Sequence, residues 1–335
     1  MAKDDLEPIA PDAAMTLYLD HRRSEVSDRT LASHRYRLKP FIEWCGENGL
    51  HNMNELTGRD LHAYRVDRRE DGDLKPISVQ TQLSTVRVFI RFCESLEAVP
   101  TDLHSKILLP TVPGEDQASQ SKLDHARAES ILDYVNRYQY ASREHVIFSL
   151  LWHTGMRSGT LRSLDVEDYH PDDGAFDAVH RPEQDTPLKN GTGGERMIAL
   201  GELQARMLED YIDGPRIDKK DDHGRNPLIT TTHGRPSTST IRDTIYRLTR
   251  PCIYGPCPHD RDPEECEATE FDHASKCPSS RSPHELRSGA ITAHLLEDVP
   301  MEIVSDRMDV SKSVLDRHYD RRTKREKMLQ RREFL

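Results

Sequence analysis

A helix that begins near the C-terminus carries a group of residues suited to binding an oxyanion. The segment reads SPHELRSGAITAHLL, with Ser282 as N-cap, Pro283 at the first helical position and Glu285 three residues after the cap. His284 and Arg287 are three residues apart and therefore share one face of the first turn. Free backbone N–H groups and the positive end of the helix dipole lie there too. A guanidinium, an imidazole and a helix N-terminus together favour phosphate as the ligand.

A tyrosine in basic surroundings follows about thirty residues later. Arg317 and His318 precede Tyr319, and Arg321 and Arg322 follow it closely. A tyrosine near a phosphate site is a candidate nucleophile. Taken singly, any His, Arg or Tyr in this stretch is more often an ordinary surface or core residue, but their combination favours a site.

Two further cationic residues complete the candidate set. Arg157 lies in HTGMRSGTLRSLDVEDY, after an apolar helix and beside a turn of small residues. Lys189 begins KNGTGG, which we interpret as the tip of a β-hairpin. This glycine-rich sequence is not a nucleotide-binding P-loop, because no Lys-Ser/Thr pair follows it.

In that order, the five residues resemble the pattern of the tyrosine recombinase (phage integrase) family, which includes the XerC/XerD-like enzymes. The family has an arginine after a TG-type turn, a lysine in a β-hairpin, an H-x-x-R pair and a C-terminal tyrosine. TGMRSGTLRSL and HELRSGAITAHLL carry the resemblance, and the acid-rich composition is most similar to integrases of salt-loving archaea. The resemblance implies these catalytic residues: Arg157, Lys189, His284, Arg287 and Tyr319.

The chemistry that the resemblance implies is also physically coherent. Cleaving a phosphodiester without a metal requires charge neutralisation on two non-bridging oxygens, which Arg157 and Arg287 could supply bidentately. His284 would bind the same phosphate or help to move the nucleophile's proton. Tyr319 would attack phosphorus to give a 3′-phosphotyrosine, and Lys189 would protonate the leaving 5′-oxygen. A second 5′-hydroxyl would then reseal the strand, so that neither ATP nor a divalent ion is needed for catalysis.

Two positions depart from the family pattern. The family usually has a second His or Trp nine residues before the tyrosine, where this chain has Val310 between Asp309 and Ser311. An acidic residue is often found three positions after the first arginine, where this chain has Thr160. Either the neighbours of Val310 take over its role or the donor is missing, which bears on the rate more than on the class of reaction.

The cysteines form a second constellation. Cys252, Cys257, Cys266 and Cys277 fall within 26 residues, with the spacing C-x4-C-x8-C-x10-C. In a cytosolic chain this pattern favours a structural zinc site over disulfides, with His259 or His273 as alternate ligands, and free or redox-active thiols remain the alternative. A bound zinc would staple an insertion directly before His284. Cys45 and Cys93 lie in helical patterns and are expected in the core.

The elements that must position these residues fall into two groups. From residue 12 to residue 100 the periodicity is helical, with helices expected over 12–24, from 27 to 46 or 49, from 57, and over 78–98. Between the apolar positions lie arginines that could face DNA in a clamp, although charged exposed faces are common on helices: Arg35, Arg37, Arg65, Arg68, Arg69, Arg87 and Arg91.

A linker and a second domain follow. Pro100, Pro110, Pro113 and Gly114 with the run EDQASQS mark a linker over 101–121. Beyond it we expect helices over 124–137, 143–154, 202–212 and 239–249, with short strands near 175–180 and 196–200. The last residues, RRTKREKMLQRREFL, predict a basic helix over 321–335 that packs on a neighbouring protomer or touches DNA phosphates.

Composition bounds the class of protein. The 335 residues carry a formal net charge of −11, and 35 of the 47 basic residues are arginine. Few lysines and many acids suit a protein that stays hydrated in concentrated salt, and a local arginine cluster can still bind DNA while the remaining surface repels it. The polar N-terminus and the lack of a long apolar run predict a soluble, cytoplasmic protein.

The sequence therefore predicts an α+β protein of two domains. A flexible tail (1–11) precedes an all-α, SAM-like core-binding domain (12–100), and a linker (101–121) leads to a mainly α catalytic domain with a small β-sheet (122–335), the DNA breaking-rejoining enzyme fold. The expected function is a site-specific recombinase that closes around duplex DNA and acts as a tetramer. The alternatives are a type IB topoisomerase-like nicking-closing enzyme and a non-catalytic DNA-binding protein of the same fold.

Overall fold

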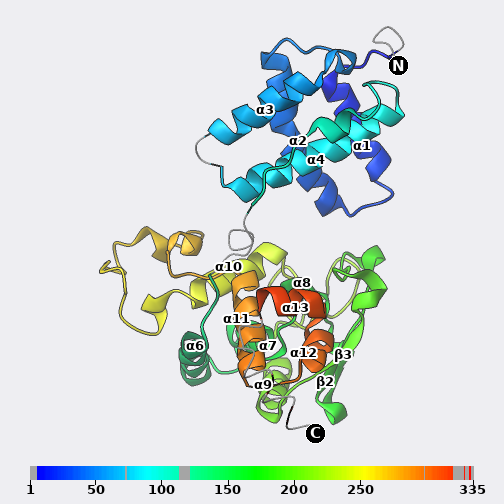
Figure 1. Ribbon diagram of the computed structural model, residues 1–335. Coiled ribbons are helices and arrows are strands. Elements are labelled where there is room, and N and C mark those ends of the chain that lie inside the picture. Colours follow the sequence, from blue (N-terminus) through cyan, green and yellow to red (C-terminus); the bar gives the residue numbers. More distant parts are fainter. Residues whose placement is uncertain are drawn as a thin grey trace. The chain divides into compact units, whose positions relative to one another are not determined.

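The computed structural model describes residues 6–71, 74–112, 121–297 and 299–319, together with Met328 and Arg332 (Figure 1). The chain divides into two compact units, Met1–Ala118 and Ser119–Leu335. The basic helix expected over 321–335 lies outside the described residues, apart from Met328 and Arg332. None of the described helices combines the length and apolar character needed to cross a membrane.

In its described residues the first unit contains the helices α1 (Pro11–Arg22), α2 (Asp28–Glu47), α3 (Gly58–Glu70) and α4 (Pro76–Ser95), with short 3-10 turns at Met53–Glu55 and Leu103–Lys106. The starts of α2 and α3 were legible in the sequence. Ser27 caps α2 by accepting from the Thr30 N–H, and Thr57 and Asp60 form a reciprocal capping box on α3.

The core of the first unit is aromatic. Phe41 packs edge-on against Tyr64 and Phe89, with ring centroids 5.1 and 6.3 Å apart, and Tyr18 meets Phe89 at 5.6 Å. Cys45 and Cys93 are buried in the same core, as predicted. Burial raises the pKa of both thiols to about 12, so they are structural rather than reactive.

The packed part of this unit extends beyond both expected boundaries. Leu6 is buried and the Glu7 N–H donates to the Glu97 carbonyl at 3.0 Å, so residues 6–10 are not the flexible tail expected there. Leu103 and Ile107 are buried in the core, so this part of the expected linker belongs to the unit. The prolines before and after Leu103 and Ile107 favoured a linker in the sequence, although these two side chains pack in the core.

Two of the arginines expected to face outward are instead bonded within the unit. The Arg68 guanidinium donates to Gln82 at 3.1 Å and to Asp71 at 2.7 Å, and Arg87 donates to the Ile107 carbonyl. These contacts hold α3 to α4 and α4 to the segment that follows it. Arg68 and Arg87 therefore stabilise the fold.

The second unit surrounds one buried helix, α7 (Arg143–Thr154), whose bounds match the prediction. It contacts α6 (His125–Tyr138), α9 (Glu202–Asp213), α10 (Thr238–Leu248) and α11 (Pro283–Leu296), and Figure 1 shows it among them. Because every face of α7 is covered, its sequence VIFSLLW is apolar without a clear stripe. Three short helices also belong to the described part of this unit: α8 (Ser158–Ser163), α12 (Met301–Met308) and α13 (Lys312–His318).

A small antiparallel sheet flanks α12. Strands β1 (Tyr169–His170), β2 (Ala175–Ala178) and β3 (Arg196–Ala199) pair in that order, with Phe176 opposite both Tyr169 and Ile198. The two predicted strands are present. KNGTGG is not a tight hairpin tip, however, because residues 179–195 separate β2 from β3 and Gly191–Gly194 form a 3-10 turn. The mainly helical architecture with one small sheet confirms the predicted α+β class.

One glycine allows the chain to cross α11 closely. A Cβ on Gly289 would lie 2.0 Å from the Leu123 carbonyl oxygen, which no side chain tolerates. The Leu123 N–H donates to the Glu285 carbonyl at 3.1 Å in the same crossing. The start of the second unit is thereby fixed against the helix that carries His284 and Arg287.

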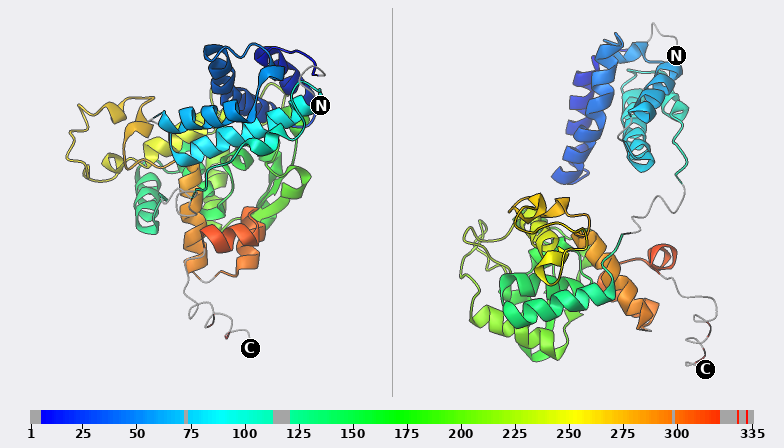
Figure 2. Two further views of the ribbon diagram at one scale, coloured as in Figure 1. Left: turned by 45° about the horizontal axis from the view of Figure 1, so that its top comes forward. Right: turned by 90° about the vertical axis from the view of Figure 1, so that its left-hand side faces the viewer.

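A segment rich in turns projects from the second unit beside α10, visible in both views of Figure 2 as the yellow and orange loops. Residues 250–281 contain the 3-10 turns Pro251–Ile253, Glu267–Thr269 and Ala274–Lys276, and no α-helix or β-strand. The four clustered cysteines lie in this segment.

Candidate active site

The TG turn at the end of α7 is where the candidate site begins. Gly155 adopts φ +58°, and a Cβ at this position would lie 2.5 Å from the Met308 sulfur. Glycine therefore satisfies both the left-handed turn and the close approach of α12. Two residues later Arg157 is the N-cap of α8, and its side chain contacts Asp309 at the end of α12.

Arg287 is the buried cation of the site. It is 6% exposed and donates to the Gly155 carbonyl at 2.6 Å and to the Asp309 carbonyl at 3.3 Å. Burial, and after it the charge of Arg157, lowers the pKa of Arg287 to about 10, which leaves it protonated at neutral pH. Both of these partners are carbonyls rather than carboxylates, so the charge of Arg287 is available to an anion.

Asp309 joins the candidate elements together. It ends α12 in the left-handed conformation, with φ +50°, and its carboxylate accepts from the Arg157 guanidinium. The same carboxylate accepts from the Asn190 amide at 2.6 Å, which anchors the β2–β3 connection beside the arginines. Arg157 and Arg287 thus both contact this one residue.

His284 lies in the first turn of α11, where the predicted capping box forms. The Ser282 N–H donates to Glu285 at 2.7 Å, and the Glu285 N–H donates back to the Ser282 hydroxyl at 3.3 Å. Burial lowers the pKa of His284, and the charges of Arg287 and Arg157 lower it further. The imidazole is therefore held in the neutral form, which can accept a proton.

Tyr319 caps α13, and its N–H donates to the Leu315 carbonyl at 2.9 Å. Its ring is partly buried against a cluster of apolar residues: Ile291, Leu295, Val304, Met308, Val310 and Leu315. In its ionised form the phenol would raise the pKa of Arg287, so the two side chains lie within electrostatic range of one another. The apolar cluster that Tyr319 packs against also holds Met308 and Val310, the two neighbours of Asp309, whose carbonyl accepts from Arg287.

Lys189 makes no contact with Asp309 or with the arginines that bind it among the interactions of the described residues. Its side chain is exposed in the β2–β3 connection, next to the anchored Asn190. No hydrogen bond or ion pair of the Lys189 ammonium occurs among the described residues. Of the five predicted residues, Arg157, His284, Arg287 and Tyr319 converge, and Lys189 lies beside them.

Sequence reasoning missed a third guanidinium. Arg196, at the start of β3, donates to the Arg307 carbonyl at 2.9 Å and to the Gly194 carbonyl at 2.8 Å. Its Nη2 is buried without a hydrogen-bond partner in the described chain, and burial lowers its pKa. An arginine at the start of a strand that follows a glycine-rich turn was the only available signal.

At the two positions that depart from the family pattern, the structure shows no side chain that replaces the expected residue in kind. Val310 is 9% exposed and packs in the apolar cluster under Tyr319, so it offers no donor. Asp309, which the sequence marked only as its neighbour, contacts Arg157 instead. Thr160 is buried in α8, and its carbonyl accepts from Ser163 at 2.8 Å.

The cysteine cluster has no ready ligand geometry. In the part of the chain that the structure describes, no group of three or more His, Cys, Asp or Glu side chains is arranged to hold a metal ion. All four thiols are free. The alternate ligands are engaged elsewhere, His259 with the Ser279 hydroxyl at 3.0 Å and His273 with Glu270 at 2.8 Å.

Part of the first unit matches a known protein family, and several recombinases are similar to this chain in sequence. Residues 16–95 match the family described as phage integrase, N-terminal SAM-like domain. A tyrosine recombinase XerD of Oceanobacillus iheyensis is 22% identical over 64% of this chain and 68% of its own length. One of Haemophilus ducreyi is 24% identical over 70% of this chain and 72% of its own length.

Solved structures of similar fold extend the match to nearly the whole chain. The Tn1549 transposon integrase in complex with a circular intermediate DNA has a TM-score of 0.68, with 16% identity, 98% of this chain covered and 100% of that one. A lambda integrase dimer bound to a core site has a TM-score of 0.66, with 14% identity, 96% of this chain covered and 80% of that one. With the family match and the relatives, the chain belongs to the tyrosine recombinase (phage integrase) family and is a tyrosine site-specific recombinase.

Proposed function

We propose that the protein cuts and rejoins duplex DNA at specific sites through a 3′-phosphotyrosine intermediate. The observation that supports this most strongly is the convergence of Arg157 and Arg287 on Asp309 at the end of α12, with His284 in electrostatic range of both arginines and Tyr319 in electrostatic range of Arg287. A group of cationic side chains beside a phenol suits attack on a phosphodiester.

The two arginines would neutralise the charge that develops on the non-bridging oxygens. Arg287 is positioned by carbonyls and needs no rearrangement to accept an anion. Arg157 would exchange part of its bonding with the Asp309 carboxylate for the phosphate. Donors of this kind are each worth about 3–4 kcal/mol of transition-state stabilisation.

The proposed step forms a bond between the Tyr319 oxygen and phosphorus and breaks the bond from phosphorus to the 5′-oxygen. The proton of the phenol passes to a base, for which the neutral His284 is the candidate. The 5′-oxygen takes a proton from Lys189, which the β2–β3 connection would swing toward DNA. The phosphotyrosine conserves the energy of the broken bond, so another 5′-hydroxyl can reverse the step without ATP or a divalent ion.

The proposed function requires a covalent bond between the protein and DNA, and a nicked substrate can trap this adduct. A duplex with a nick close after the scissile phosphate loses its short 5′-hydroxyl fragment after cleavage, and so traps the adduct. In buffer with EDTA and the presumptive attachment sequence, we expect a denaturation-resistant protein–DNA adduct from the wild type. Tyr319→Phe should form none, and Tyr138→Phe is the matched control because Tyr138 is 67% exposed in the same unit. Tight binding of this DNA without an adduct would instead favour the non-catalytic alternative.

The role of Lys189 has its own test. A substrate with sulfur in place of the bridging 5′-oxygen has a leaving group that needs no protonation. Lys189→Ala should slow cleavage of the ordinary substrate by about 10²–10⁴-fold and cleavage of the sulfur substrate very little. Arg287→Ala should slow both, because its loss removes charge stabilisation. Equal slowing of both substrates by Lys189→Ala would assign the acid to another group.

The partners in this proposal are paired double-stranded DNA sites and further copies of the chain. One solved structure of similar fold is a lambda integrase tetramer bound to a Holliday junction. We propose a tetramer during exchange, acting in the cytoplasm. A topoisomerase-like enzyme would instead relax supercoils as a monomer. Any metal would serve the fold rather than the reaction.

A further inference from the structure

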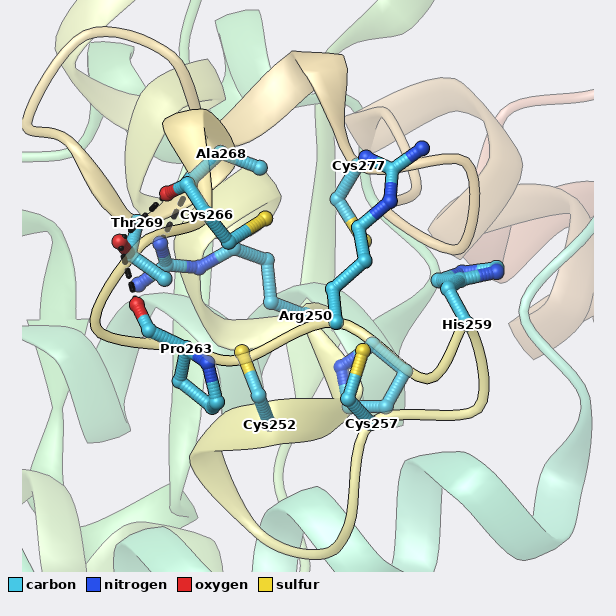
Figure 3. Close-up of a pocket in the computed structure, with 11 residues that line it drawn as sticks. Arg250, Cys252, Cys257, His259, Pro263, Cys266, Ala268, Thr269 and Cys277 are labelled. Atoms are coloured by element: carbon cyan, nitrogen blue, oxygen red, sulfur yellow. Dashed lines mark hydrogen bonds between the residues drawn. The ribbon is translucent and has the colours of Figure 1, made fainter.

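The four clustered cysteines line a single cavity, although they come from separate turns. Cys252 lies in the 3-10 turn Pro251–Ile253 and Cys257 in the loop after it, while Cys266 precedes Glu267–Thr269 and Cys277 follows Ala274–Lys276. Figure 3 shows their sulfur atoms around a common space, approached from opposite sides. Cysteines spread over 26 residues of sequence do not share a space through local helix or strand geometry.

The segment that holds them has almost no hydrophobic core of its own. Between residues 250 and 281 the buried apolar side chains are those of Ala268 and Ala274, and the large Phe271 is 77% exposed. Turns of this length cannot bury enough apolar surface to offset their ordering entropy. Small segments of this kind are usually held by disulfides or by a structural metal.

The charges around the cavity distinguish these two cross-links. Arg250 and Arg261 line the same cavity as the cysteines. The Nε of Arg250 is buried without a hydrogen-bond partner in the described chain, while its Nη1 is held by the Ala268 carbonyl. A zinc ion with four thiolates carries a net charge of about −2, which two guanidiniums would offset. Two neutral disulfides would leave these cations uncompensated.

We propose that Cys252, Cys257, Cys266 and Cys277 bind one structural Zn²⁺ ion as thiolates. Zinc is the preferred ion for a closed tetrahedral sulfur site, with Zn–S distances of about 2.3 Å. Binding draws the four sulfurs together from the cavity walls by side-chain rotation. His259 also lines the cavity, but its ring is bonded to the Ser279 hydroxyl and stays outside the ligand set.

The site would fix the helix that carries the candidate catalytic residues. Directly after Cys277, the Ser279 carbonyl accepts from Arg127 at 2.9 Å, the Ser280 hydroxyl donates to the Tyr246 carbonyl at 3.2 Å, and the Arg281 N–H donates to the Thr249 hydroxyl at 2.8 Å. These bonds tie the end of the segment to α6 and α10, one residue before the N-cap of α11. This consequence rests on the proposed function, whereas metal binding does not.

Metal content of the full-length protein tests the inference without DNA. Protein purified with reductant should contain about one zinc per chain by mass spectrometry of the metal. Replacement by Co²⁺ should give the intense thiolate-to-cobalt absorption of a tetrahedral sulfur site. Protein without zinc whose thiols all react in the native state would overturn the proposal. An intact mass lower by two hydrogens per bridge would overturn it in favour of disulfides.

Variants separate the ligands from the fold. Cys266→Ser should lose the zinc, Cys266→His should retain it because imidazole also binds zinc, and Cys45→Ala should retain it because Cys45 lies in the core of the first unit. If Cys266→Ser does not fold, zinc analysis of the wild type and of Cys266→His still decides the question. Full zinc content in Cys266→Ser would exclude this cysteine as a ligand and overturn the four-thiolate site. Zinc-replete protein that forms no DNA adduct would contradict the proposed function alone.

Discussion

Asp309 is the residue through which the candidate active site is held together. Its carboxylate accepts from Arg157 and Asn190, and its carbonyl accepts from Arg287. These three partners come from three places in the sequence, all distant from position 309, so no local pattern links them. The capping box of α11 could be predicted from the sequence, and it placed His284 and Arg287 in the first turn. The contact between Arg157 and Asp309 could not be predicted in this way.

Two substitutions of Asp309 should separate the contribution of its charge to stability from that of its side-chain oxygens and backbone conformation. Asp309→Asn loses the charge but keeps one acceptor oxygen and tolerates the left-handed conformation, so it should lower the free energy of unfolding by about 1 kcal/mol. Asp309→Ala removes both bonds and strains the backbone, and should lower it by roughly 2–4 kcal/mol. Denaturant unfolding measures both values. Equal values for the two variants would show that the hydrogen bonds of Asp309 contribute nothing to stability.

Among the elements, the turn between α7 and α8 sets the position of Arg157 through one glycine. Gly155→Ala places a Cβ 2.5 Å from the Met308 sulfur and adds strain at φ +58°, so it should destabilise the protein by roughly 2–3 kcal/mol. Gly159→Ala is the matched control, because nothing lies within 4 Å of its Cβ and it sits within α8. It should be neutral or slightly stabilising. Thermal unfolding of the two variants compares them, and equal losses would contradict the packing described.

Buried histidines at the ends of α7 should make stability depend on pH. Burial lowers the pKa of His145 to about 4, and its Nδ1 accepts from the Ala141 N–H at 3.2 Å. The unfolded chain binds a proton below pH of about 6.5, and the folded imidazole does not until about pH 4. Stability is therefore present above pH 6.5 and falls between pH 6.5 and 4, by about 3 kcal/mol for this group.

His145→Asn isolates that contribution, because the asparagine oxygen can replace the accepting nitrogen but does not titrate. Urea unfolding at a series of pH values should show a slope between pH 6.5 and 4 that is smaller by about one proton in the variant. His153, whose pKa burial also lowers to about 4, should preserve part of the slope in both proteins. An unchanged slope would mean that His145 is protonated in the folded chain.

Helices and strands could be predicted from the sequence where the residues that determine them lie close together in the chain. The bounds of α7 and the N-caps of α2, α3, α6 and α11 were read from side chains within one turn. The helices α8, α12 and α13 have 6, 8 and 7 residues, too few for a periodic pattern. The two strands that flank KNGTGG pair as expected, but the length of the β2–β3 connection and the contact of Asn190 with Asp309 could not be read from the sequence, because neither is local.

On the scale of the whole molecule, charge composition constrains how DNA can be bound. The net charge is −11, and arginine supplies 35 of the 47 basic side chains. We propose a protein suited to concentrated salt, in which DNA binding depends on shape and water release more than on phosphate contacts. The plot of log K against log salt should then be shallower than the slope of about −5 to −9 given by 6–10 phosphate contacts.

That slope is measured with Tyr319→Phe, which avoids covalent capture, by titrating duplex DNA at several concentrations of potassium chloride. The matched control is a lysine-rich DNA-binding protein under the same conditions. A slope as steep as that of the control would contradict the account of salt-adapted binding and leave the proposed chemistry untouched.

The central claim is that Tyr319 carries the DNA 3′-phosphate, and the most direct measurement is to identify that linkage. The trapped adduct would be digested with protease and nuclease and its peptides examined by mass spectrometry, while the released strand is tested for a free 5′-hydroxyl. The account predicts a nucleotide on the peptide that contains Tyr319, joined through its 3′-phosphate, and a released 5′-hydroxyl end. A nucleotide on any other residue, or a 5′-phosphate linkage, would contradict it.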